Sequence, residues 1–375
     1  MEYCMTLQDS PFFRADHVGS LLRPPALAAA RRSWKSGDMD VAGFRAIEET
    51  ALREVVAGQR DVGLNAITDG EYQRDWWHLD FLAGFDGIDM WHTSLGGGFN
   101  NEEQPPLVRV TGLIDWPDGG IFVEAFKRLK TLVEDLAPDA TPKLTIPGPG
   151  MMQLRAGRRA IEPVYTDQDL FWSDLTAAYR KEIAALAAAG CTYLQIDDVS
   201  FAYLCDDNQR QNLRNRGEDP DDVLIQYRDA TNEALRHRPP GMMITTHMCR
   251  GNFKSSWVAK GGYGRVAEVL FPTHKADGYF LEYDSDRAGG FEPLTHVPHD
   301  KFVVLGLVGT KTGCLELTDD IRRRIEQAAD FLPMDNLCLS PQCGFSSTYH
   351  GNDLTVDQQW AKLRLVTDLA RDVWG

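Results

Sequence analysis

Ala-Ala-Leu-Ala-Ala-Ala-Gly-Cys-Thr-Tyr-Leu-Gln-Ile-Asp-Asp, residues 184–198, joins the end of a predicted helix to a short apolar strand. The helix spans residues 167–189, with Thr166 as its candidate N-cap and Gly190 ending it. A helix that leads directly into an apolar strand is the repeating unit of a parallel α/β fold. Asp197 follows that strand, at the edge where such folds place their active sites.

The same alternation continues along the chain. Eight strand candidates separated by helical patterns predict a closed (β/α)8 TIM barrel, with the site at the carboxyl ends of the strands. The strand candidates are residues 13–18, 64–68, 143–146, 193–197, 243–247, 278–282, 302–307 and 336–340. Further helices are predicted at residues 40–62, 119–136, 220–236 and 318–331.

A long insertion separates the second and third strands, over approximately residues 72–142. It holds Trp76, Trp77 and a Gly-Gly-Gly run at 96–98, and we interpret it as a hairpin excursion over the barrel mouth. The two tryptophans can stack on a planar donor or form a small core of the insertion itself. Because no linker or internal repeat is visible, residues 1–375 are predicted to form a single catalytic domain.

Composition restricts the partners of the chain. A formal net charge of −16 without a basic block argues against nucleic acid and anionic membranes. No apolar run reaches the ~20 residues of a membrane span, and no signal-peptide pattern opens the sequence. Seven cysteines without secretory features indicate reduced thiols and a cytoplasmic location. The expected partners are small molecules, and the sequence leaves a homo-oligomer open.

Four residues with metal-ligand chemistry follow different strands. His247 and Cys249 point the same way if residues 243–249 are extended, because side chains alternate along a strand. Glu282 ends the sixth strand and Cys343 follows the eighth, so all four meet at one rim of the barrel. A lone His-x-Cys pair is more often packing, but this placement predicts a Zn²⁺ site that activates a thiol.

Other strand ends carry candidate substrate ligands. Glu71 lies on a glycine-containing loop after the second strand, where it can accept an ammonium group or be a solvated turn residue. Asp197 is either an arginine partner or a substrate ligand. Gly19 and Ser20, after the first strand, can offer backbone N–H groups and a hydroxyl to a carboxylate.

Taken in order, these stretches resemble the cobalamin-independent methionine synthase family, in its short members that lack the N-terminal barrel. The resemblance implies a zinc-dependent thiol S-methyltransferase of methionine biosynthesis, which methylates homocysteine to a methionine-type thioether. It also implies zinc ligation by the four residues above, amino-group binding by Glu71 and Asp197, and carboxylate binding near Ser20. The motifs that carry it are Phe-Arg-Ala-Asp-His-Val-Gly-Ser-Leu-Leu-Arg-Pro, Thr-Asp-Gly-Glu, Leu-Gln-Ile-Asp-Asp, His-Met-Cys-Arg-Gly-Asn, Phe-Leu-Glu-Tyr-Asp and Leu-Ser-Pro-Gln-Cys-Gly-Phe.

Two departures from the family leave the donor open. Lys311 stands about where the family has a proton-shuttling histidine, which makes it a third catalytic candidate beside Glu71 and Asp197. Residues 145–152 lack the folate-stacking tryptophan expected after the third strand. The alternative is a zinc-dependent S-alkyltransferase with another donor or thiol, similar to epoxyalkane:coenzyme M transferase. A zinc-holding protein without transfer activity also remains open.

Overall fold

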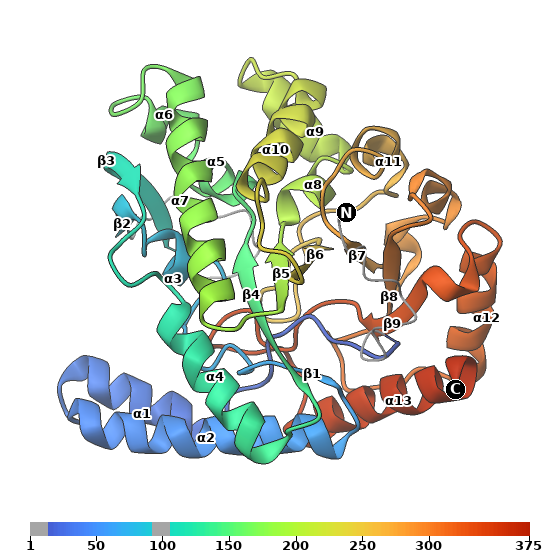
Figure 1. The fold of residues 1–375 in the computed structure, drawn as a ribbon. Coiled ribbons are helices and arrows are strands. Elements are labelled where there is room, and N and C mark those ends of the chain that lie inside the picture. The colour runs from blue at the N-terminus through green and yellow to red at the C-terminus, as the bar shows by residue number, and fades with distance from the viewer. Residues whose placement is uncertain (1–13, 92–105) are drawn as a thin grey trace.

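A curled parallel sheet forms the centre of the molecule. The computed structural model describes residues 14–91 and 106–375. Seven strands pair with their neighbours in chain order, and Figure 1 shows the helices packed around the outside of the sheet. The strands are β1 (Ala66–Ile67), β4 (Thr141–Pro147), β5 (Tyr193–Asp197), β6 (Met243–Met248), β7 (Gly278–Glu282), β8 (Phe302–Val308) and β9 (Leu337–Pro341).

The eighth place in the ring is taken by residues 14–20. The sequence predicts a regular strand at 13–18, and this is wrong for the residues described, because Ala15 makes only one isolated parallel bridge, to Leu339. On the other side, Thr68 Oγ1 donates to the Gly19 carbonyl oxygen at 2.6 Å. The segment turns out of strand geometry at Gly19, whose φ is +133°. A parallel α/β barrel results, with side-chain contacts replacing part of one ladder.

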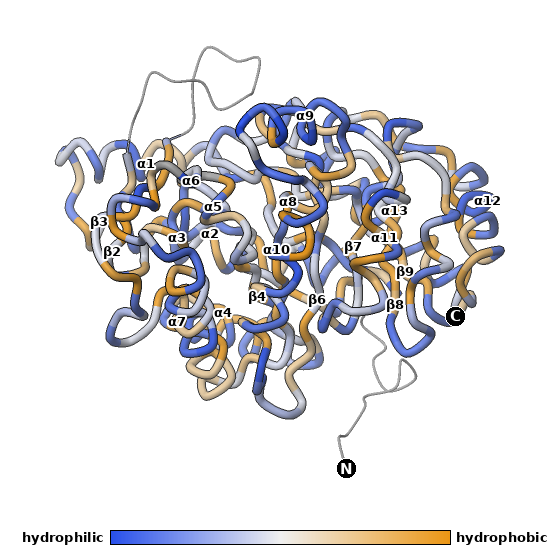
Figure 2. The backbone as a smooth tube through the Cα atoms, turned by 90° about the horizontal axis from the view of Figure 1, so that it is seen from above, coloured by the Kyte–Doolittle hydropathy of each residue, from blue (hydrophilic) through white to orange (hydrophobic). Residues whose placement is uncertain are grey.

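Amphipathic helices cover the sheet. In α12, for example, the buried residues Ile321, Ile325 and Ala328 recur every three or four positions and so share one face. Figure 2 shows apolar chain gathered inside and hydrophilic segments such as α9 at the periphery. The outer helices are α2 (Val41–Asp61), α4 (Val123–Leu136), α7 (Gln168–Ala188), α10 (Pro220–Ala234), α11 (Gly264–Leu270), α12 (Thr318–Ala329) and α13 (Val356–Trp374).

Short helices fill the connections between these elements. They are α1 (Pro25–Ser36), α3 (Leu79–Leu82), α5 (Gly150–Ala156), α6 (Arg158–Ile161), α8 (Val199–Tyr203), α9 (Asp207–Asn215), η3 (Asp286–Ala288), η4 (Glu292–His296) and η5 (Met334–Asn336). The predicted N-cap Thr166 is wrong by one residue, because the Asp167 carboxylate accepts from the Asp169 N–H at 2.9 Å. Among the described residues, no helix has both the length and the apolar content to cross a bilayer.

The insertion after β1 contains an antiparallel hairpin, β2 (Asp86–Trp91) and β3 (Leu107–Asp115). The hairpin packs against α5, α6 and α7, whereas α4 packs against α2 and β4 as a barrel helix. Glu182 of α7 anchors the chain after the hairpin, accepting from Trp116 Nε1 at 2.7 Å. The Gly-Gly-Gly run lies outside the described residues, so coverage of the barrel mouth stays a prediction.

Candidate metal centre and substrate pocket

The four predicted metal ligands come together at the carboxyl ends of β6, β7 and β9. Their ligand atoms all lie within 4.8 Å of one another, and all four residues are buried. The Sγ atoms of Cys249 and Cys343 are 3.2 Å apart. His247 and Cys249 face the same way because they are two residues apart in extended chain, and Glu282 ends the neighbouring strand.

These donor atoms fit a metal ion better than they fit each other. Within the described residues, neither ring nitrogen of His247 has a partner at hydrogen-bond geometry, although the Cys343 thiol lies beside the ring, and Oε2 of Glu282 has only an ion-pair contact with Arg287 at 3.9 Å. Oε1 of Glu282 accepts from the Arg250 N–H at 3.1 Å. Buried polar atoms are normally satisfied, so several unpaired acceptors around two sulfurs fit a site that binds a cation. Imidazole, thiolates and a carboxylate are the donor set of zinc.

The surroundings of the cluster lower the pKa of one of its two thiols. The hydrogen bond from Cys249 and the neighbouring imidazole of His247 hold the pKa of the Cys343 thiol well below its usual value, with a smaller contribution from Lys311. Burial and the negative charge of Cys343 act in the opposite direction on Glu282, raising its pKa. The surroundings therefore favour the anionic form of Cys343 and disfavour that of Glu282, so the Glu282 carboxylate gains most from a cation beside it.

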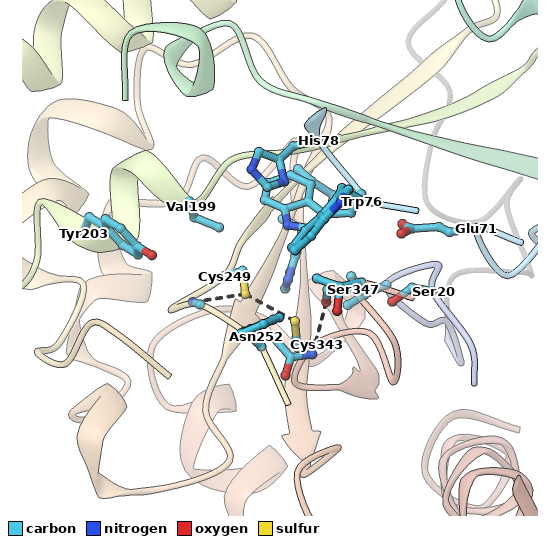
Figure 3. Close-up of a pocket in the computed structure, with 17 residues that line it drawn as sticks. Ser20, Glu71, Trp76, His78, Val199, Tyr203, Cys249, Asn252, Cys343 and Ser347 are labelled. Atoms are coloured by element: carbon cyan, nitrogen blue, oxygen red, sulfur yellow. Dashed lines mark hydrogen bonds between the residues drawn. The ribbon is translucent and has the colours of Figure 1, made fainter. Parts of the chain in front are cut away.

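The ligands open onto a pocket that also contains the predicted substrate acids. Its cavity volume is about 40 Å³, within about 580 Å³ of space between the lining residues that includes open solvent. Figure 3 shows the two sulfurs at its floor, Glu71 and Ser20 on one side, and Trp76 with His78 above. The lining residues are Val18, Ser20, Glu71, Trp76, Trp77, His78, Asp197, Val199, Tyr203, His247, Cys249, Gly251, Asn252, Phe253, Cys343, Ser347 and Thr348.

Glu71 is held in a strained position. Its φ is +61°, in the left-handed region that side chains other than glycine rarely adopt. Oε1 accepts from Thr145 Oγ1 at 3.0 Å, and Arg74 lies 3.9 Å away, while Oε2 has no hydrogen-bond partner among the described residues. Burial raises the pKa of this carboxyl group. A cation arriving at Oε2 would both satisfy that atom and favour ionisation.

Asp197 ends β5 and faces the same pocket. Its Oδ1 accepts from Gln195 Nε2 at 2.6 Å, so its hydrogen-bond partner in the barrel is neutral and not an arginine. Burial raises the pKa of Asp197 to about 7, with the negative charge of Glu71 acting in the same direction and His247 in the opposite one. Of the two roles left open by the sequence, this environment favours a substrate ligand.

Gly19 and Ser20 shape the wall beside Glu71. A Cβ on Gly19 would lie 2.7 Å from Cγ2 of Thr145, so no larger residue fits. The Ser20 hydroxyl oxygen accepts from the Ser346 N–H at 3.3 Å and borders the pocket. The segment predicted to bind a carboxylate thus lies beside the acids predicted to bind an ammonium.

Of the remaining predicted site residues, the two tryptophans line the pocket and Lys311 does not. Trp76 and Trp77 line the pocket, and Trp76 stacks on Phe253 with ring centroids 6.1 Å apart. Lys311 does not line it: its Nζ lies 3.3 Å from Asn252 Oδ1, behind the loop that carries Cys249.

Several lining residues were not predicted. They stand directly after the predicted ligands or strand ends, and that position was the available signal. They are His78, Val199, Tyr203, Asn252, Phe253, Ser347 and Thr348.

Fold and site together define a parallel α/β barrel with a buried His-Cys-Glu-Cys cluster that could hold a metal ion at the carboxyl ends of its strands. The family model described as cobalamin-independent synthase, catalytic domain, matches residues 144–371, more than half of the chain. The chain belongs to this family.

Relatives support this membership. The uncharacterized protein YxjH of Bacillus subtilis is 44% identical over 364 residues, covering 96% of this chain and 95% of that protein. The crystal structure of a putative vitamin-B12 independent methionine synthase from Listeria monocytogenes is 38% identical, with a TM-score of 0.77 and coverage of 97% and 98%. A 5-methyltetrahydropteroyltriglutamate–homocysteine methyltransferase of Bacillus velezensis is 22% identical over 90% of this chain and 40% of its own length.

Proposed function

We propose that the protein is a zinc-dependent methyltransferase that methylates the sulfur of homocysteine or a similar amino-acid thiol. The observation that carries the proposal is a single pocket lined by three of the four clustered zinc-type donors, His247, Cys249 and Cys343, and by two buried acids, Glu71 and Asp197. A relative over 90% of this chain is named as a homocysteine methyltransferase. A reducing, cytoplasmic location belongs to the proposal, because the two ligand thiols must stay reduced.

Different residues along the pocket bind the sulfur, the ammonium group and the carboxylate of the substrate. Zinc held by His247, Cys249, Glu282 and Cys343 would lower the pKa of a substrate thiol so that the thiolate predominates at neutral pH. Glu71 and Asp197 bind the ammonium group of the amino acid, and its positive charge favours their ionised forms. Ser20 lies on the same side and receives the carboxylate.

Positioning is the second contribution of the barrel. Trp76 and Phe253 are 7% and 2% exposed, so the walls of the pocket are packed before substrate arrives. A thiol fixed at its amino and carboxylate groups presents its sulfur to the donor in one orientation. Holding two reactants in place can supply several kcal/mol of the barrier reduction, about 7–11 in the best cases.

Replacement of a ligand cysteine tests the proposal. Cys343→Ser and Cys249→Ser should each abolish stoichiometric zinc and thioether formation together, because serine is a poor zinc ligand. Cys338→Ser is the matched control, since Cys338 is equally buried in β9 but outside the cluster, and it should keep both. Zinc is measured by mass spectrometry of the metal, and thioether by liquid chromatography–mass spectrometry. Full transfer by a zinc-free variant would exclude the mechanism.

The alternative thiol, one that carries a sulfonate as in coenzyme M, finds less support. Among the lining residues that the structure describes there is no lysine or arginine, while Glu71 and Asp197 lie where the far end of the thiol must go. A sulfonate there would face two carboxylates. Comparing homocysteine with coenzyme M as substrates distinguishes the two candidates.

A further inference from the structure

Asn252 joins the two loops that carry the cysteines of the cluster. These loops are residues 249–252 after β6 and residues 342–347 after β9, and we call them the cysteine loops. The Nδ2 atom of Asn252 donates to the carbonyl oxygen of Gly344 at 2.8 Å and, as Figure 3 shows, to Oγ of Ser347 at 3.1 Å. One asparagine side chain thus connects the backbone around one thiol to the backbone around the other.

Lys311 contacts this asparagine from outside the pocket. Its Nζ donates to Asn252 Oδ1 at 3.3 Å and to the Gly251 carbonyl oxygen at 3.5 Å. An ammonium group only donates and a backbone carbonyl only accepts, so Lys311 and Gly344 together fix which way the Asn252 amide group points. A reversed amide group would lose both contacts.

The segment that carries Lys311 is itself fixed to the second cysteine loop. The N–H and the hydroxyl of Thr310 both donate to Oε1 of Gln342, each at 2.7 Å. Gln342 directly precedes Cys343, and Asn352 Nδ2 donates to the Thr310 carbonyl oxygen at 2.9 Å. The chain after β8 therefore contacts one cysteine loop through Thr310 and the other through Lys311.

The positive charge of Lys311 lies close to ligands that become anions. Among the described residues its Nζ contacts only carbonyl-type oxygens, so no carboxylate neutralises it there. Arg287 is a second cation, 3.9 Å from Oε2 of Glu282, but it donates to both oxygens of Asp284 at 2.9 Å. The charge of Lys311 favours the anionic forms of both cysteines and of Glu282, against the burial that opposes them. Two thiolates and a carboxylate carry more negative charge than one zinc ion neutralises, so a cation at this place stabilises the ligand set.

We propose that Lys311 is a positioning residue of the metal centre. Through Asn252 it holds the two cysteine loops at one spacing, and its charge offsets part of the negative charge of the ligands. Lys311 therefore acts on the ligands and not on the reacting atoms, unlike the histidine that the family has at about this position. This inference rests on the zinc site of the proposed function and assigns a role to a residue outside the pocket.

Zinc affinity measures this role before any substrate is added. The full-length protein is freed of metal under reducing conditions and competes for Zn²⁺ with a chromophoric chelator of known affinity. Lys311→Met should weaken zinc binding about tenfold to hundredfold, the range found when an outer partner of metal ligands is removed. Lys311→Arg keeps the charge and the donors, and it should bind zinc nearly as tightly as wild type. Wild-type affinity in Lys311→Met would overturn the inference, and so would equal losses in the two variants.

Lys301→Met is the matched control, because Lys301 stands before β8 as Lys311 stands after it. Its Nζ donates to the carbonyl oxygens of His274 and Ala276, which are not part of the cluster. This variant should bind zinc as wild type does. A loss equal to that of Lys311→Met would be a general effect of removing a partly buried lysine and would overturn the inference. Circular dichroism verifies that each variant is folded before it is titrated.

The connection through Asn252 is tested by combining two substitutions. Asn252→Ala alone should weaken zinc binding, because it removes the hydrogen bonds between the cysteine loops. If Lys311 acts through Asn252, the double variant should lose less affinity than the product of the two single losses. Losses that simply multiply would mean that the two side chains act independently, and would overturn the inference.

Failure of the proposed function gives a different result. A wild-type protein that binds zinc but forms no thioether from homocysteine, with 5-methyltetrahydrofolate or S-methylmethionine as donor, contradicts the proposed function. The comparison of zinc affinities still decides the role of Lys311 in that case. A Lys311→Met variant that binds zinc normally but has lost transfer places Lys311 in the reaction itself. That outcome overturns the inference and leaves the proposed function standing.

Discussion

Arg23 connects the two loops that form one side of the pocket. One nitrogen of its guanidinium group donates to the carbonyl oxygens of Glu71 and Arg74 at 2.7 and 2.8 Å. The other donates to the carbonyl oxygens of Ser346 and Thr348 at 3.0 and 3.1 Å. Only a planar guanidinium group, with N–H donors that point in several directions, reaches both loops at once. Arg23 thereby holds the strained backbone of Glu71 without contacting substrate, as a positioning residue.

Arg23→Lys should raise KM for the thiol about tenfold with a smaller change in kcat, because an ammonium group cannot satisfy both loops. Zinc content should not change. Steady-state kinetics with separate KM and kcat values provide the readout. Arg14→Lys is the matched control, since Arg14 also donates to two carbonyl oxygens, those of Asp335 and Leu337, away from the pocket. A similar KM increase in both variants would reduce Arg23 to a structural role.

Residues that carry chemistry were predictable, whereas residues that hold them were not. His247, Cys249, Glu282 and Cys343 were found because each stands at or just after a strand end, and a barrel gathers strand ends at one rim. Arg23 was missed because its partners lie on two distant loops, one of which, with Ser346 and Thr348, is more than 300 positions away in the chain. The roles proposed for Glu71, Asp197, Ser20, Trp76, Trp77 and Lys311 stay predictions.

At the scale of elements, a buried ion pair fixes the segment 14–20. Lys143 of β4 donates to Asp16 Oδ1 at 3.0 Å and to the His17 carbonyl oxygen at 2.7 Å. The hydroxyl of Tyr193 donates to Asp16 Oδ2 at 2.6 Å. Lys143 and Asp16 are both fully buried, and burial raises the pKa of Asp16 while it lowers that of Lys143. These bonds replace the ladder that a regular eighth strand would have made.

Lys143→Met should lower the free energy of unfolding by about 3–5 kcal/mol, because Asp16 is left buried without its cation. Combining it with Asp16→Leu should recover part of this loss, since neither charge then remains. Urea unfolding of wild type, both single variants and the double variant gives the coupling energy. Strictly additive losses would mean that the pair does not act as a unit.

Residues 14–20, Arg-Ala-Asp-His-Val-Gly-Ser, are mostly polar and carry no apolar strand pattern of their own. Gly19 adopts a conformation that ends the pairing. The strands β4 to β9 were predicted well, because each is an apolar run between polar segments. The helix α4 was placed correctly in sequence, yet its packing on α2 could not be read from periodicity.

For the whole molecule, His274 contributes to sensitivity to acid. It is buried, and its ring contacts Phe201 edge-on at 5.8 Å. Burial, with the nearby cations Lys301 and Arg228, lowers the pKa of His274 to about 3. The unfolded chain binds the proton near pH 6.5, so acid favours the unfolded state from about pH 6.5 downward. At pH 5 this one group should cost about 2 kcal/mol of stability.

His274→Asn should make the loss of stability between pH 7 and pH 5 smaller by about 2 kcal/mol. Asparagine retains an acceptor for the Ala276 N–H, which lies 3.3 Å from the His274 ring, but it does not titrate. Urea unfolding at both pH values provides the measurement. His237→Asn, at an exposed position, should leave the difference unchanged. An unaltered difference in His274→Asn would show that this histidine is not responsible.

The barrel as a whole was predictable because its strands are neighbours in chain order. The hairpin of β2 and β3 could be located but not placed, because its contacts with α5 and α7 depend on surfaces far away in sequence. The local sequence pattern is therefore enough to predict the barrel strands, whereas the position of the β2–β3 hairpin depends on long-range contacts.

The bridge between Ala15 and Leu339 joins segments that are translated far apart in time, so it can form only late in synthesis. Ser20 emerges early from the ribosome, but the chain that completes its wall, around Ser346, is made more than 300 residues later. Until Cys343 has been translated, the nascent chain has only three of its four metal donors. A metal held by all four residues would bind only after Cys343 is made, and the segments made first must stay unpaired until then without aggregating.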